Sequence, residues 1–92
     1  MDKTIHEPAR LRIMAHLYKA RDASFTALRD AAELTDGNFA THAARLQVAG
    51  FVESRRVFEG GRFVQRFQIT KEGSKAFRGY LAELRALLDA SD

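Results

Sequence analysis

The feature that most limits how this chain can fold is the order of patterns between Phe25 and Thr70. A short helical pattern is followed by a tight turn, a second helical pattern, and two runs rich in β-branched and aromatic residues. The two runs, residues 51–59 and 62–70, are separated by two glycines, a pair typical of a two-residue β-hairpin turn. The segment therefore predicts two helices packed across each other, followed by a β-hairpin.

Further helical patterns flank this segment on both sides. Pro8 suits the first turn of a helix that we expect to end near Ala20, because the missing N–H of proline is not needed there. Thr70 is expected to cap a last helix that reaches Ala90, with Glu72 in its first turn. The hairpin is therefore expected to lie between helices, as a projection from a mostly helical fold.

The ends of the middle elements are predicted from capping and turn residues. A minimal strand is expected at residues 23–25, and Thr26 is expected to cap the first helix of the pair. Residues 35–38 predict the turn, and the second helix is expected to end where Gly50 adopts a left-handed conformation. The predicted fold class is α+β and mostly helical, in the order helix, short strand, helix, helix, strand, strand, helix. The last two strands form the hairpin, which we call the wing.

Apolar periodicity predicts which faces are buried. The apolar side chains of the first helix spread over an arc of about 160°, which suggests that a second partner packs on one flank. The buried line of the third helix is expected to consist of Phe39, Ala43 and Leu46. On the second long strand, alternation gives one face to Phe63, Phe67 and Ile69, and the other to Arg62, Val64, Arg66 and Gln68.

The composition argues against several classes of protein. The chain has no cysteine, and its histidines at positions 6, 16 and 42 lack metal-ligand spacing, so we expect no metal and no cofactor. No apolar run approaches the roughly 20 residues of a membrane span, so we expect a cytoplasmic protein without a membrane partner. We find no catalytic constellation and expect no enzyme activity. The 92 residues are expected to form one domain.

The positive charge is concentrated in one part of the chain. The net charge is +3, and residues 37–71 alone carry six basic and two acidic side chains. Residues 1–36 are balanced, and residues 72–92 carry one net negative charge. The excess therefore lies on the expected third helix and the wing, which is the distribution that a nucleic-acid surface requires.

Four short segments are specific enough to compare with known families: Ile5 to Arg10, Leu34 to Asn38, Arg45-Leu46 with Ala49 to Val52, and Ile69 to Gly73. These segments and the order of elements resemble the winged helix-turn-helix transcription regulators of the broad MarR, ArsR and PadR group. The resemblance implies this fold and a DNA-binding role. We therefore expect a sequence-specific transcription regulator, a repressor, that acts as a homodimer and associates with the nucleoid. Ala43 departs from the usual leucine, which suggests a compensating large residue such as Phe39. Ala44 replaces a common basic residue, and the wing lacks a proline often found beyond its tip.

The expected DNA-binding residues lie on the third helix and the wing, with the helix in the major groove and the wing on the backbone or minor groove. Asn38 could pair with adenine, and Arg45 with guanine or a phosphate. Other roles remain open: a local turn bond for Asn38, an ion pair with Glu53 for Arg45, and a structural role for His42. The full set is Gly37, Asn38, Ala40, Thr41, His42, Ala44 and Arg45 on the helix, and Arg55, Arg56, Arg62 and Arg66 on the wing.

A dimer interface is expected on the last helix, residues 72–90, with help from the first. The expected contacts are Leu11, Met14, Tyr18, Phe77, Tyr80, Leu81, Leu84, Leu87 and Leu88. The same apolar faces also fit a pocket for a small-molecule effector. An alternative function is a winged helix used for protein contacts within a larger complex, which apolar or acidic residues on the exposed face of the third helix would favour.

Overall fold

The computed structural model describes residues 1–91, and within them the elements follow the predicted order. The helices are α1 (Pro8–Ala20), α2 (Phe25–Ala31), α3 (Asp36–Val48) and α4 (Lys71–Ala90), and the strands are β1 (Asp22–Ser24), β2 (Val52–Glu59) and β3 (Arg62–Ile69). Helices account for more than half of the chain, so the prediction of an α+β, mostly helical winged fold is confirmed.

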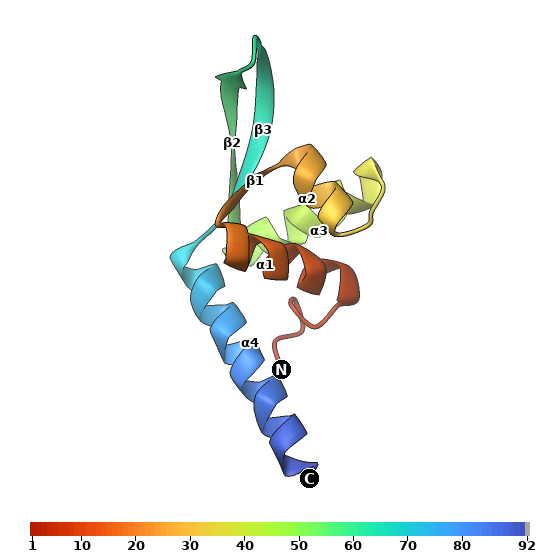
Figure 1. Ribbon diagram of the computed structural model, residues 1–92, viewed down its shortest axis with the longest axis vertical. Coiled ribbons are helices and arrows are strands. Elements are labelled where there is room, and N and C mark those ends of the chain that lie inside the picture. Colours follow the sequence, from red (N-terminus) through yellow and green to blue (C-terminus); the bar gives the residue numbers. More distant parts are fainter. Residues whose placement is uncertain (92) are drawn as a thin grey trace.

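The sheet is antiparallel, with β3 between β1 and β2. β2 and β3 pair along their whole length, from Val52 opposite Ile69 to Glu59 opposite Arg62. β1 pairs only with residues 66–68 at the base of the hairpin. The two turn glycines have φ values of 60° and 78°, the conformation that a tight two-residue hairpin needs and that glycine adopts without strain. The outer half of the hairpin therefore projects as a wing without a third strand (Figure 1).

The start of α2 differs from the prediction. The Ser24 hydroxyl accepts a hydrogen bond from the backbone N–H of Ala27 at 3.1 Å, so Ser24 is the N-cap and the prediction of Thr26 is wrong. β1 accordingly ends at Ser24, and Phe25 is already helical. Both serine and threonine cap helices well, so residue type alone could not separate two candidates that lie two positions apart.

The other predicted caps are confirmed. The Thr35 hydroxyl accepts from the N–H of Asn38 at the start of α3, and Gly50 follows that helix with a φ of 82°. The Thr70 hydroxyl accepts from the N–H of Gly73 at 2.9 Å and donates to the Gly50 carbonyl at 2.6 Å. One threonine thus both starts α4 and ties it to the end of α3.

The core lies where α1, α2 and α3 meet the inner face of the sheet. Phe39 of α3 is fully buried and makes edge-to-face contacts with Phe25 and Phe67, with ring centroids 4.8 and 5.3 Å apart. Ala43, one turn later on α3, is also buried. The large Phe39 therefore fills the core beside the small residue, as the sequence suggested. Such packing fixes the angle at which α3 leaves the core.

The molecule is elongated, with principal dimensions of 53 × 25 × 21 Å. The wing projects at one end and the second half of α4 at the other, with the three shorter helices between them (Figure 1). Within residues 1–91, no helix combines the length and the apolar character needed to cross a membrane.

Candidate nucleic-acid interface

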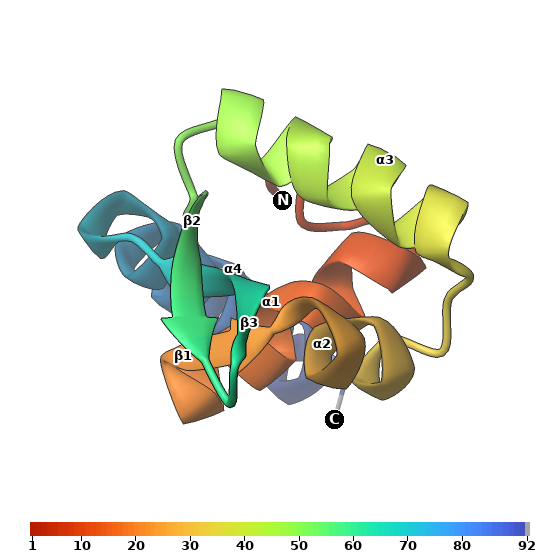
Figure 2. The ribbon, with the colours of Figure 1, turned by 90° about the horizontal axis from the view of Figure 1, so that it is seen from above.

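The outer face of α3 is open to solvent along its whole length. Figure 2 shows α3 along one side of the molecule, with no other element over its outer side. At about 100° per residue, the centre of this face carries Gly37, Thr41, Ala44 and Val48, all exposed, with Val48 at 90%. The Thr41 hydroxyl donates to the Gly37 carbonyl at 3.1 Å. The centre is thus smooth and small, and carries no charged side chain.

Polar side chains lie on the two flanks of this face. The flank toward the wing carries Ala40 and Gln47, both exposed. The Gln47 amide donates to the Ser54 hydroxyl of β2 at 3.1 Å. The opposite flank carries Asn38 and Arg45, both exposed. Among the described residues Arg45 makes no ion pair, so the alternative of a pair with Glu53 is wrong. The Arg45 charge is therefore available to a ligand.

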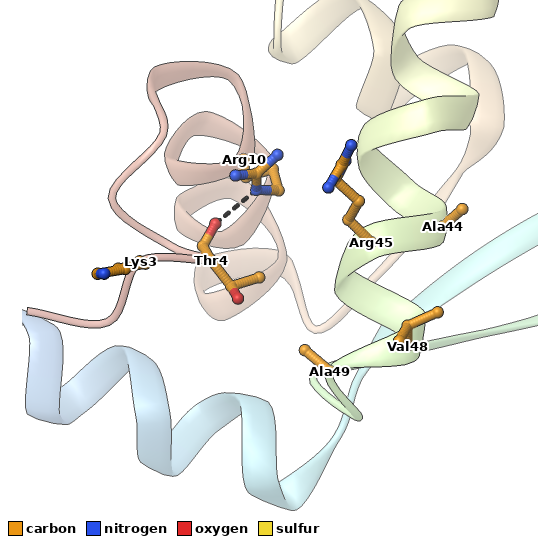
Figure 3. A pocket seen from close by; sticks show the side chains of 7 residues that line it. All are labelled: Lys3, Thr4, Arg10, Ala44, Arg45, Val48 and Ala49. Atoms are coloured by element: carbon orange, nitrogen blue, oxygen red, sulfur yellow. Dashed lines mark hydrogen bonds between the residues drawn. The ribbon is translucent and has the colours of Figure 1, made fainter.

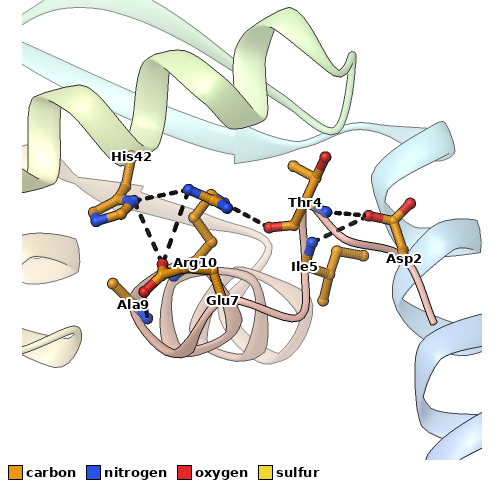
Figure 4. Close-up of polar contacts among 7 residues, drawn as sticks. All are labelled: Asp2, Thr4, Ile5, Glu7, Ala9, Arg10 and His42. Atoms are coloured by element: carbon orange, nitrogen blue, oxygen red, sulfur yellow. Dashed lines mark hydrogen bonds and ion pairs between the residues drawn. The ribbon is translucent and has the colours of Figure 1, made fainter.

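His42 faces inward, toward the start of α1. Its Nδ1 lies 3.4 Å from a carboxylate oxygen of Glu7 and 3.1 Å from a guanidinium nitrogen of Arg10 (Figure 4). Glu7 also accepts from the N–H groups of Ala9 and Arg10, and so caps α1. Burial tends to raise the pKa of this carboxyl, but the two backbone bonds and the neighbouring cations lower it overall. These contacts favour the structural role of His42 over contact with a phosphate.

Two of the four wing arginines are held by carboxylates within the chain. Asp22 of β1 accepts from Arg66 at 2.6 Å and from Arg55 at 3.0 Å, and Arg66 also donates to Glu59 at 3.1 Å. The hydrogen bond from Arg66, then that from Arg55, holds the pKa of the Asp22 carboxyl below its ordinary value. The outer face of the sheet is thus partly neutralised, and Arg55 and Arg66 brace its base.

The other two wing arginines make no ion pair within residues 1–91. Arg62 follows the turn and is exposed, and the Arg56 guanidinium lies over the Phe63 ring, 4.8 Å from its centroid. Phe63 shares a face with Phe67, as predicted, yet it is 63% exposed and packs against exposed Phe58. The wing extends past the helices, so nothing covers this aromatic pair.

The residues expected at a dimer interface fall into two groups. Met14, Phe77 and Tyr80 are buried within the single chain, and Leu11 and Tyr18 are half-buried against the same core. Their burial needs no second copy. The leucines in the second half of α4 are exposed by 36 to 64% of their surface. These four are Leu81, Leu84, Leu87 and Leu88.

The histidines do not gather into a metal site. His6 Nδ1 lies 2.9 Å from the Tyr80 hydroxyl of α4, and His42 contacts Glu7 and Arg10. In the described part of the chain, no group of three or more His, Asp or Glu side chains has an arrangement that could hold a metal ion.

An uncovered helix that follows a tight turn, and is itself followed by a β-hairpin, defines a winged helix-turn-helix domain, a class that inserts the second helix of the pair into DNA. The chain belongs to the family of winged helix DNA-binding domains, which it matches over residues 9–88. It is a small winged-helix transcription regulator, and the resemblance found in the sequence is confirmed.

Three known proteins are similar to this chain in sequence or in structure. The uncharacterized protein MJ0432 of Methanocaldococcus jannaschii is 34% identical over 85 residues, which cover 92% of each chain. The structure of a transcriptional regulator homologue from Pyrococcus horikoshii has a TM-score of 0.90 at 30% identity, covering 97% of this chain and 88% of that one. The homodimeric winged helix-turn-helix DNA-binding domain of Mb0332 from Mycobacterium bovis has a TM-score of 0.78 at 21% identity, covering 96% and 78%. The last similarity shows the fold alone.

Proposed function

We propose that this protein is a sequence-specific regulator of transcription, a repressor, that binds double-stranded DNA as a homodimer in the cytoplasm, in association with the nucleoid. It carries out no catalysis. α3 enters the major groove, and the wing contacts the backbone or the minor groove. The observation that carries this proposal is the open, small-residue face of α3, which is flanked by the free arginine Arg45 on one side and by the wing, with Arg56 and Arg62, on the other.

The small residues of α3 suit a close approach to base edges. Gly37 allows the backbone itself to come near, while Ala40 and Ala44 offer methyl groups to thymine. Asn38 lies in the first turn of α3, the part of a recognition helix that normally reads bases, and its amide matches adenine. Its backbone N–H is already bonded to Thr35, which leaves the side chain for the DNA.

The homodimer is supported by the exposed leucines of α4 and by the homodimeric state of the Mb0332 domain, which has the same fold. Pairing two copies through the second half of α4 would bury these leucines about a two-fold axis. Two recognition helices would then contact half-sites about one DNA turn apart, roughly 34 Å. The operator is therefore expected to be an inverted repeat.

The proposal is tested by selecting binding sites from genomic fragments with the purified protein, followed by titrations at several salt concentrations. If a dimer neutralises about six phosphates, the slope of log K against log salt should be about −5. An inverted repeat among the selected fragments, overlapping a promoter, is the expected result. Failure to bind any fragment at low salt would contradict the proposal.

A second candidate, a winged helix for protein contacts, is favoured by one observation. The centre of the α3 face is small and apolar, and Val48 is almost fully exposed. The free arginines on both flanks favour DNA instead, because the DNA backbone offers them phosphates, whereas binding to a protein does not in general require them. The salt titration separates the two, since a binding constant that is insensitive to salt would favour a protein partner.

A further inference from the structure

An open hollow of about 570 Å³ lies between α3 and the segment that precedes α1 (Figure 3). Its lining combines three basic side chains with small or apolar ones. The lining residues are Lys3, Thr4, Arg10, Ala44, Arg45, Val48 and Ala49. The sequence indicated only Arg45 and Ala44 as binding residues, because nothing in the pattern of residues 1–10 showed that this segment would lie beside α3. We call this site the basic hollow.

The segment before α1 is held firmly in place beside α3. The Asp2 carboxylate accepts from the N–H groups of Thr4 and Ile5, and Ile5 is fully buried (Figure 4). The Arg10 Nε donates to the Thr4 carbonyl at 2.6 Å. One wall of the basic hollow is therefore fixed before any ligand binds, which lowers the entropy cost of binding.

The cations of the basic hollow come from both walls. Arg10 is fixed by Thr4 and His42, and only 13% of its side chain is exposed. Figure 3 shows the Arg45 side chain on the side of α3 that faces Arg10. The nearest carboxylate, Glu7, pairs with Arg10 at 4.0 Å and also caps the start of α1. Arg10 and Arg45 both line the hollow, so an anion bound there would be attracted by two guanidinium groups.

The position of the hollow beside α3 indicates which anion it binds. A helix in the major groove has a sugar–phosphate backbone on each side of it. The wing lies on one flank of α3, where Gln47 contacts Ser54, and the basic hollow extends from the centre of the α3 face to the other flank, where Arg45 lies. We propose that the basic hollow binds a phosphate of the DNA backbone, with Arg10 and Arg45 as its main donors and Lys3 at its rim. This inference rests on the proposed function, and it extends the DNA contacts to the segment before α1.

The test compares Arg45→Gln with Arg85→Gln, which removes the same charge from the exposed part of α4. For one lost phosphate contact, counterion release predicts about eightfold weaker binding at 0.1 M salt and a slope shallower by about 0.9. A dimer loses two contacts, so Arg45→Gln should weaken binding about 60-fold, equally for operator and random duplex. Lys3→Gln should act in the same direction with a smaller effect. Arg85→Gln should bind like wild type, and circular dichroism checks that all three variants are folded.

Each other outcome has a definite meaning. If Arg45→Gln binds DNA like wild type, the phosphate assignment is wrong while the proposed function stands. If it changes the preference at one base pair only, Arg45 reads a base, and the assignment is again wrong. If inorganic phosphate shifts the Arg45 and Arg10 signals in NMR spectra but the variant keeps its DNA affinity, the hollow binds a free anion instead. If wild-type protein binds no duplex, the proposed function fails first.

Discussion

Asp22 shows how one side chain decides what the wing arginines can do. It binds both Arg55 and Arg66, so these two stabilise the sheet, whereas Arg56 and Arg62 carry charge that DNA can use. All four are candidate DNA contacts from the sequence, but alternation along the strand places Arg55 and Arg56 on opposite faces, so not all four can contact DNA. The sequence could not show the difference, because Asp22 and Arg66 are separated by 44 positions and meet only through the pairing of β1 with β3.

Asp22→Asn is expected to lower the free energy of unfolding at neutral pH by about 1 kcal/mol, because Arg55 loses its charged partner and Arg66 keeps only Glu59. The folded pKa of Asp22 lies below its ordinary value of 3.8, so its contribution is complete above that pH. The contribution is lost as the pH falls through the folded pKa. Urea titrations should therefore give a gap between wild type and variant that narrows from pH 7 to pH 3. A gap of equal size at both pH values would contradict this account.

Arg62→Ala and Arg66→Ala form a matched pair on one face of β3. Arg62 has no partner among the described residues, so its loss should weaken binding to every duplex by about eightfold per contact at 0.1 M salt and leave the melting temperature unchanged. Arg66→Ala should instead lower the melting temperature, because Glu59 loses its arginine donor and Asp22 keeps only Arg55. Binding titrations and thermal melts on both variants measure the two effects. Equal DNA affinities for Arg62→Ala and wild type would show that the wing does not contact the backbone.

At the scale of elements, the junction between the hairpin and α4 is set by one glycine. A Cβ on Gly73 would collide with the Phe51 carbonyl oxygen and approach the Ile69 side chain to 3.0 Å. Gly73→Ala is therefore expected to cost about 1–3 kcal/mol of stability, despite the higher helix propensity of alanine. Gly79→Ala is the control in the same helix, since a Cβ there meets nothing within 4 Å, and it should stabilise by up to about 1 kcal/mol. Thermal unfolding of both variants checks the opposite signs.

The helices and strands could be largely predicted from the sequence, whereas the tertiary contacts between them could not. Local chemistry determines the starts of α1, α3 and α4 and the end of α3, because a capping side chain or a left-handed glycine acts within four residues. The same chemistry failed at α2, where two good caps lie close together. The basic hollow depends on residues 3 and 10 meeting α3, which is a tertiary contact without a local pattern.

At the scale of the whole molecule, the 53 Å length separates the wing from the exposed leucines of α4. The wing lies at one end, α3 lies with the other short helices between the ends, and the second half of α4, with its exposed leucines, lies at the other end (Figure 1). Helix α4 is about 30 Å long at 1.5 Å per residue, so its second half passes beyond the core that buries Phe77 and Tyr80. An apolar row of this kind in water favours association with a second copy.

We therefore expect sedimentation equilibrium at micromolar concentration to give a dimer of about twice the 10.4 kDa chain mass. Leu84→Glu should give monomers and weaken operator binding, because it buries a charge in the proposed interface. Ala82→Glu is the matched control, since residue 82 is exposed on the opposite side of α4 and gains the same charge. If wild type is a monomer, or if Leu84→Glu stays dimeric like Ala82→Glu, the second half of α4 is not the interface. In that case the operator is expected to lack an inverted repeat, because the spacing of the two half-sites depends on the pairing of the α4 helices.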